Sequence, residues 1–276
     1  MDPYIVEGLK RHEARFAVIL TKHCNLKCRG CSAFSNISEP CFYDYENLKK
    51  DLKKISDVCN VTGISFLGGE PLLYPKLKDV LIYTRKLLPH AGLTIFTNGK
   101  DLVKLNMWKL LRALNICIIY TKYTDSKIDY EAISKKARIY GMQCLNINEC
   151  ECKITTMEQK DKFFLFRLSK NVSSECIQSK ADKCPMNCVE MWDSKIFLCL
   201  HTALIDTLNN KFSEKFLWRD GDYLEIQNLT SDKYFNFISS PTPFCEYCFN
   251  EEPIQIPWST QKAKQEDFII PYKRVE

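Results

Sequence analysis

The chain carries the run FAVILTKHCNLKCRGC at residues 16–31, in which an apolar segment leads directly into three cysteines. Phe16–Thr21 has the composition of a buried strand. Cys24, Cys28 and Cys31 follow this strand with the spacing C-x3-C-x2-C. Three thiolates on one loop can hold three irons of a [4Fe–4S] cluster, and the fourth iron is then open to a small molecule.

The cysteine content of the whole chain favours metal binding over disulfides. The 276 residues include 15 cysteines, an odd number in a chain too large to need disulfide staples. The first twenty residues hold no apolar signal segment, so we expect a cytoplasmic protein, where grouped cysteines usually ligate metal. Zinc with His23 as a fourth ligand, buried thiols and chance spacing stay as alternatives, because zinc closes a tetrahedron with four ligands.

Charge and hydropathy argue against two classes of partner. Lys and Arg exceed Asp and Glu by 39 to 34, a net charge of +5 that is scattered along the chain, so we expect no nucleic acid. No apolar run approaches the ~20 residues that a membrane span needs, so we expect no membrane contact. The balance of 45% apolar and 26% charged residues is that of an ordinary globular protein.

Strand-like and helix-like segments alternate after the cysteine loop. Leu48, Leu52, Ile55 and Cys59 recur at helical spacing, which predicts the first helix. The alternation predicts a parallel sheet with helices outside it. The expected helices are 45–59, 77–88, 101–111, 130–140 and one around 157–168, and the expected strands are 16–21, 63–67, 93–96, 116–120 and 143–147.

A second motif stands at the end of the second expected strand, where Gly68-Gly69-Glu70-Pro71 follows an apolar run. Glycines at the carboxyl end of a strand let the backbone approach a ligand closely, and ligand sites of parallel α/β sheets lie at that end. Alone, this sequence is compatible with an ordinary turn. Together with the C-x3-C-x2-C loop, it resembles the motifs of the radical S-adenosylmethionine (radical SAM) superfamily. Thr97-Asn98-Gly99 after the third strand is also similar to that family.

The resemblance covers roughly residues 16–170 and implies a partial (β/α)6 barrel. It implies that the open iron binds the amino and carboxylate groups of SAM. One electron then cleaves the sulfonium to methionine and a 5′-deoxyadenosyl radical, which abstracts a hydrogen atom from the substrate. A flavodoxin- or ferredoxin-type protein would donate the electron. The ligands implied for the cluster are Cys24, Cys28 and Cys31, and the residues implied for SAM are Gly68, Gly69, Glu70, Pro71 and Asn98.

Two further positions and one departure accompany the resemblance. Thr121 and Asn146, at the ends of the fourth and fifth strands, are placed to touch SAM, although polar residues often simply end a strand. Many family members have an aromatic residue directly before the third cysteine, whereas this chain has Gly30. Phe34 and His23 are the nearby aromatic candidates for its role.

A second group of cysteines follows the α/β pattern. Cys188 and Cys199 flank a segment that predicts a β-hairpin with its turn at Asp193-Ser194-Lys195. Cys245 and Cys248 form a C-x2-C pair. Four thiolates from a hairpin and a pair are enough to close either a cluster or a zinc site.

Beside a radical SAM domain, this second group resembles the twitch or SPASM auxiliary domains, which implies an auxiliary [4Fe–4S] cluster. Ser194 stands where those hairpins carry a glycine, and Cys184 is the alternative to Cys188 as a ligand. We therefore expect three parts: a radical SAM core over 1–175, a small auxiliary β-hairpin/helix domain over 176–249, and an extended tail over 250–276.

The ligand count bears on the reaction. Four thiolates leave no open iron for substrate, so the auxiliary cluster would carry electrons. An electron carrier suits a two-electron oxidation. The layout resembles that of the radical dehydrogenases of cyclitols, which carry out such an oxidation. Only residues 1–15 precede the first strand, which leaves no room for a leader-peptide domain and favours a small, carbohydrate-like substrate. Candidate catalytic groups are Arg167 as a base, and Cys41 and Cys150 as hydrogen-atom donors.

Two alternatives stay open for the function. The first is a peptide-modifying radical SAM enzyme that epimerises, crosslinks or oxidises a peptide brought by a separate protein. The second, from another class, is a non-enzymatic zinc or Fe–S binding protein.

Overall fold

The computed structural model describes most of the chain, and every structural statement below concerns these residues. They are 12–123, 126–142, 144–146, 162–170, 177–182, 184, 188–248 and 254–270. Asn146 belongs to this set through its backbone alone, and Cys150 lies outside it.

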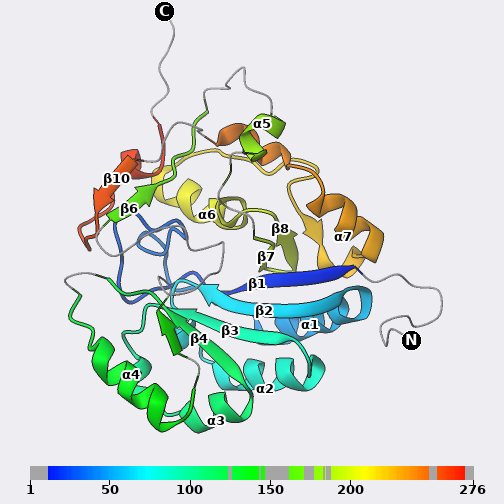
Figure 1. The fold of residues 1–276 in the computed structure, drawn as a ribbon. Helices are drawn as coiled ribbons and strands as arrows, with labels where there is room; N and C mark the ends of the chain where they lie inside the picture. Colours follow the sequence, from blue (N-terminus) through cyan, green and yellow to red (C-terminus); the bar gives the residue numbers. More distant parts are fainter. Residues whose placement is uncertain are drawn as a thin grey trace, which may run out of the picture.

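A mostly parallel sheet forms the centre of the molecule, in the order β5-β4-β3-β2-β1-β7-β8-β9 (Figure 1). The first five strands pair parallel to one another in sequence order, as predicted. Their carboxyl ends therefore meet at one edge, beside the loop that follows β1 (Figure 1). The parallel strands are β1 (Glu13–Thr21), β2 (Asn60–Gly68), β3 (Gly92–Thr97), β4 (Ile116–Tyr120) and β5 (Cys144–Asn146).

Four helices lie along the outer side of these strands (Figure 1), which makes the α/β architecture consistent with a partial radical SAM barrel. In α1, Leu48, Leu52 and Ile55 are fully buried, as their spacing predicts, and Asp44 caps the helix. No helix in the described part of the chain combines the length and apolar character that a membrane crossing requires. The four helices are α1 (Tyr45–Val58), α2 (Leu77–Leu87), α3 (Trp108–Ala113) and α4 (Tyr130–Ile139).

The helix expected from Asp101 is shorter and begins later than its sequence indicates. A 3-10 turn at Leu102–Lys104 precedes α3. The side chain of Asp101 makes no cap to this turn, because its Oδ2 accepts a hydrogen bond from Asn25 Nδ2 at 2.7 Å.

The predicted hairpin is present and is continuous with the central sheet. β7 (Glu190–Trp192) and β8 (Lys195–Phe197) are joined by Asp193 and Ser194, whose φ angles of 49° and 57° are those of a two-residue type I′ turn. β7 pairs parallel with β1, and β9 (Leu224–Glu225) pairs with β8. The other helices of this part are α5 (Ile177–Asp182), α6 (Leu200–Phe212) and α7 (Ser231–Ile238).

The segment expected as a helix around 157–168 is a strand where the structure describes it. β6 (Lys162–Leu165) pairs antiparallel with β10 (Ile254–Pro257), so the C-terminal tail returns to the core (Figure 1). The helix prediction is wrong over these residues because a short apolar run fits either period, and the partner strand lies ninety residues away in sequence. Residues 157–161 of that prediction lie outside the described residues.

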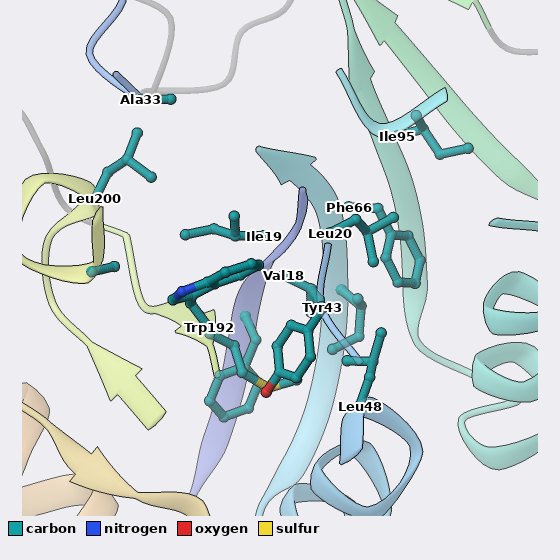
Figure 2. Close-up of a cluster of buried hydrophobic side chains, with 14 of the residues drawn as sticks. Val18, Ile19, Leu20, Ala33, Tyr43, Leu48, Phe66, Ile95, Trp192 and Leu200 are labelled. Atoms are coloured by element: carbon teal, nitrogen blue, oxygen red, sulfur yellow. The ribbon is translucent and has the colours of Figure 1, made fainter. Parts of the chain in front are cut away.

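Side chains of β1 pack in one hydrophobic core together with residues of the other parallel strands and of the β7–β8 hairpin (Figure 2). Val18, Ile19 and Leu20 have no exposed surface. Leu20 and Phe66 lie toward the parallel strands, whereas Trp192 reaches the same cluster from the hairpin (Figure 2). The hairpin therefore shares its hydrophobic core with the α/β part, and its burial contributes to the stability of both.

A buried carboxylate ties the hairpin turn to α1. Asp51 Oδ2 accepts hydrogen bonds from Tyr43 Oη and Ser194 Oγ, each at 2.8 Å, and its Oδ1 accepts one from Gln227 Nε2 at 3.2 Å. Burial raises the pKa of this carboxyl, while the three donors lower it. Asp51 supplies the acceptor oxygens of these three hydrogen bonds, so all three depend on it.

We predict that Asp51→Ala lowers the free energy of unfolding by about 2–3 kcal/mol, since it leaves buried donors without an acceptor. Urea unfolding followed by circular dichroism measures the change. Asp57→Ala on the same helix is the matched control. Asp57 is exposed and forms an ion pair with Lys53, so its loss is expected to cost at most about 0.5 kcal/mol. Equal losses in the two variants would contradict the role of Asp51.

Candidate functional site

The loop after β1 places three thiols at the carboxyl edge of the sheet. Cys24 and Cys28 are buried, and Cys31 is partly buried. Burial raises the pKa of Cys24 to about 11 and that of Cys28 to about 12, and each is raised further by its neighbouring cysteines. The pKa of Cys31 is also raised, chiefly by burial. Without a cation nearby, these thiols therefore stay protonated at neutral pH.

The same loop aims hydrogen-bond donors at the sulfur atoms. The backbone of Ala33, Ser35 and Asn36 and the Ser35 side chain all hydrogen-bond Cys31 and lower its pKa. The backbone N–H groups of Leu26 and Lys27 do the same for Cys24. Such donors stabilise a thiolate, so the donor set fits a bound cationic cluster. Among the described residues, no three His, Cys, Asp or Glu side chains converge closely enough to hold a single metal ion.

The glycine pair brings the end of β2 against this loop. Gly69 N donates to Thr21 O at 2.7 Å, and Glu70 N donates to His23 O at 2.8 Å. A Cβ on Gly69 would lie 2.1 Å from His23 O. Gly68 has a φ of +132°, and a Cβ there would lie 2.2 Å from Thr21 O. Only glycine fits at these two positions, because backbone atoms occupy the space of a side chain.

Glu70 holds the ends of β2 and β3 together. Its fully buried carboxylate accepts hydrogen bonds from Thr97 Oγ1 at 2.7 Å, from Asn98 N at 2.8 Å and from Leu72 N at 3.0 Å. Burial raises the pKa of Glu70 to about 7, although the three donors act in the opposite direction. Pro71 follows as the first residue of a 3-10 turn.

Asn98 connects this arrangement to the cysteine loop. Its Nδ2 donates to Asn25 Oδ1 at 2.8 Å and contacts Cys24 Sγ at 3.6 Å, while its Oδ1 accepts from Lys100 N at 2.9 Å. The sequence did not mark Asn25 as a site residue, because nothing in its local pattern distinguishes it from a loop asparagine.

The three thiols, both glycines, Asn98 and Thr121 line one cavity of about 210 Å³. Glu70 and Pro71 support its rim from behind and do not line it. Asn146 lies on the neighbouring strand, where its backbone pairs with Tyr120. Tyr123 and Phe163 also line the cavity and were missed, since Tyr123 follows the strand end in a loop and Phe163 was assigned to a helix.

The departure at Gly30 has a structural explanation. A Cβ at this position would lie 2.9 Å from Leu165 Cδ2 and 3.0 Å from Phe163 Cδ1. β6 therefore fills the space in which a side chain at position 30 would stand. Phe34 is fully buried between His201 and Phe268, with ring centroids 5.2 and 5.5 Å away, so its ring is committed to the core.

The cysteines of the second group line another cavity, of about 340 Å³. Its wall includes Cys184, Cys188, Cys199, Cys245 and Cys248. Cys199 precedes α6, and the backbone N–H groups of Thr202 and His201 lower its pKa. Burial outweighs these donors and raises the pKa of Cys199 to about 12. A helix N-terminus of this kind favours an ionised sulfur once a cation is present.

The five thiols are not equivalent in this cavity. Cys199 interacts electrostatically with Cys184 and Cys245. Cys188 interacts with the carboxyl of Glu190, and burial raises the Cys188 pKa to about 12. Glu190 is itself buried, and its Oε2 has no hydrogen-bond partner among the described residues.

Two consecutive residues at the start of α6 line different cavities. Leu200 lines the first cavity and Cys199 lines the second. Figure 2 shows Leu200 reaching toward Ala33 of the cysteine loop, and both residues line the first cavity. The start of α6 is therefore the wall between the two groups of thiols.

The structure does not bring Arg167 or Cys41 to either cavity, and Cys150 lies outside the described residues. Arg167 is partly buried just after β6, and Cys41 is exposed, with its carbonyl bonded to Thr21 Oγ1 and Lys22 N. Neither residue lines a cysteine cavity. A wider surface groove of about 860 Å³, which includes Trp218 and Lys233, contains no cysteine.

Residues 18–136 match the family model of the radical SAM superfamily. The chain contains a radical SAM domain. It is 29% identical over 103 residues to the GTP 3′,8-cyclase of Mycobacterium sp. (strain KMS), which is 36% of this chain and 29% of that protein. It is 27% identical over 104 residues to molybdenum cofactor biosynthesis protein 1 of Bos taurus, which is 37% of this chain and 16% of that protein. The chain thus spans less than a third of the length of these relatives.

A solved structure extends the similarity beyond the radical SAM domain. The crystal structure of BtrN in complex with AdoMet and 2-DOIA matches 95% of this chain and 100% of that one, with a TM-score of 0.51 and 19% identity. At this identity the comparison shows a shared fold.

We predict that Gly69→Ala lowers the free energy of unfolding by at least about 2 kcal/mol and disturbs the cysteine loop, since its Cβ collides with backbone. Denaturant unfolding and iron uptake on anaerobic reconstitution measure the two effects. Gly63→Ala in β2, the strand that Gly69 follows, is the control, because its Cβ would meet only ordinary contacts of 3.5 Å and more. A Gly69→Ala protein that matches Gly63→Ala in both measurements would refute the close approach.

Proposed function

We propose that this protein is a radical SAM enzyme. Cys24, Cys28 and Cys31 hold a [4Fe–4S] cluster, and SAM lies in the 210 Å³ cavity along Gly68 and Gly69. Bound there, the cluster supplies the electron that cleaves SAM and generates a carbon radical. The observation that carries the proposal is the convergence of the three thiols and the glycine edge on one cavity.

The chain's own residues prepare this cavity. The N–H and hydroxyl donors around Cys31 stabilise its thiolate. Gly68 and Gly69 leave backbone rather than side chain at the rim, so a ligand can approach closely. Glu70 acts on the cavity indirectly. Its carboxylate accepts a hydrogen bond from the backbone N–H of Asn98, and the polar side chain of Asn98 lines the cavity.

The second cavity holds the proposed auxiliary cluster. We assign its ligands as Cys184, Cys199, Cys245 and Cys248. This choice follows the electrostatic interactions of Cys199 with Cys184 and Cys245, whereas Cys188 interacts with the carboxyl of Glu190. Four protein ligands make this cluster an electron carrier, and its place behind the Cys199–Leu200 wall is next to the SAM cavity.

We propose that the reaction oxidises a small, carbohydrate-like molecule. Removal of a hydrogen atom leaves a substrate radical, and a second electron and a proton must then leave to complete the oxidation. The auxiliary cluster proposed for the second cavity would accept that electron. The similarity to BtrN over 95% of this chain, with 2-DOIA in that structure, supports a small molecule rather than a peptide. An external flavodoxin- or ferredoxin-type protein reduces the cluster that cleaves SAM.

We predict that Cys28→Ala abolishes the formation of 5′-deoxyadenosine from SAM under a strong reductant, because a three-thiol site loses one iron ligand. Liquid chromatography of anaerobic reactions measures the product. Cys117→Ala is the control, since Cys117 lies on β4 and lines neither cavity. Product formation by Cys28→Ala at the wild-type rate would overturn the proposed cluster site.

We predict that Cys184→Ser and Cys188→Ser differ in iron content. The wild-type protein is expected to hold about eight irons, four per cluster. Cys184→Ser should hold only about half of this, because the auxiliary cluster loses a ligand. Cys188→Ser should match the wild type. The reverse pattern would make Cys188 the ligand, and zinc in place of iron would exclude the auxiliary cluster.

A further inference from the structure

The C-terminal segment from Ile254 to Ile270 runs across the cysteine loop. It begins with β10, which lies beside β6 near that loop (Figure 1). It ends with Phe268 and Ile269, which are buried in the main core. The sequence predicted an extended tail over 250–276, and nothing in that sequence indicated a contact with the cysteine loop.

Contacts on Arg29 fix the middle of this segment. Arg29 N donates to Ser259 O at 2.9 Å. The Arg29 guanidinium makes two hydrogen bonds to the carboxylate of Asp267, at 3.0 and 2.8 Å, in a bidentate pair. Arg29 lies between Cys28 and Cys31 in sequence, so the segment is attached to the cysteine loop itself.

Trp258 directly precedes the first of these attachments and contacts Cys28, one of the proposed cluster ligands. Its Nε1 donates to Cys28 Sγ at 3.2 Å. Its ring stacks on Tyr123, with centroids 5.3 Å apart and planes at 26°, and Tyr123 in turn stacks on Phe163 at 6.5 Å. The indole nitrogen can only donate, and its ring is held by stacking, so the direction of this hydrogen bond is determined.

The physical consequence concerns the charge on the sulfur. A hydrogen bond donated to a cysteine sulfur stabilises negative charge on it, and Trp258 Nε1 donates one to Cys28 Sγ. A cluster gains negative charge when it is reduced. Hydrogen bonds to its sulfurs therefore stabilise the reduced form and raise the reduction potential.

We propose that Trp258 is a positioning residue that sets the reduction potential of the SAM-binding cluster through its hydrogen bond to Cys28. The C-terminal segment thus tunes a cofactor that it does not ligate. This inference rests on the proposed cluster at Cys24, Cys28 and Cys31.

The test is the midpoint potential of the cluster in Trp258→Phe, which keeps an aromatic ring and loses the N–H group. Redox titration followed by electron paramagnetic resonance measures it, with the signal assigned by its change on adding SAM. We expect normal iron content and a shift to more negative potential. Trp108→Phe is the control, since it also loses an indole hydrogen bond, to Leu102 O, but lines neither cysteine cavity, and it should keep the wild-type potential.

An unchanged potential in Trp258→Phe with full iron content would overturn the role of Trp258 and leave the proposed function intact. Absence of the SAM-responsive signal from the wild-type protein would instead overturn the proposed function. Should Trp258→Phe fail to retain its cluster, the protein labelled with 5-fluorotryptophan answers the same question. The more acidic N–H should shift the potential in the positive direction, and an identical potential would refute the proposal.

Discussion

The backbone contact between Gly68-Gly69 and the segment after β1 is the constraint on which the site depends. A Cβ on either glycine would lie about 2 Å from a carbonyl oxygen, at 2.2 and 2.1 Å, so side chains are excluded there. The contact brings the end of β2 against the cysteine loop. Glu70 follows, and its carboxylate accepts hydrogen bonds from Thr97 and Asn98 at the end of β3. Three strand ends are thereby held in one arrangement around the cavity.

Burial and charge act against each other in both groups of thiols. Burial raises the pKa of Cys24, Cys28 and Cys199 well above that of an exposed thiol. The nearby N–H donors reduce this cost without removing it. Thiols in such surroundings ionise when a cationic group binds, which couples cofactor binding to the local fold. Trp258 Nε1 is one such donor, since it hydrogen-bonds Cys28 Sγ.

The parallel core could be predicted from the sequence because its signals are local. Leu48, Leu52 and Ile55 show the buried face of α1, and Asp193-Ser194 shows the hairpin turn. The prediction of secondary structure was wrong where a strand depends on a partner far away in the sequence. Lys162–Leu165 is a strand because residues 254–257 pair with it, and no local pattern contains that partner. For the same reason Tyr123 and Trp258 were missed at the site, although the cysteines and glycines were found.

The sequence by itself determined the cysteine spacing, the glycine pair and the alternation of strands and helices, since each is written within a few neighbouring residues. Tertiary structure alone decided that Phe163 and Leu165 occupy the space beside Gly30, that α6 divides two cavities, and that the C-terminal segment reaches Cys28. The physical reason is the distance along the chain over which each kind of interaction acts. Steric limits and periodicity act along the chain, whereas packing and hydrogen bonds join residues that only the completed fold brings together.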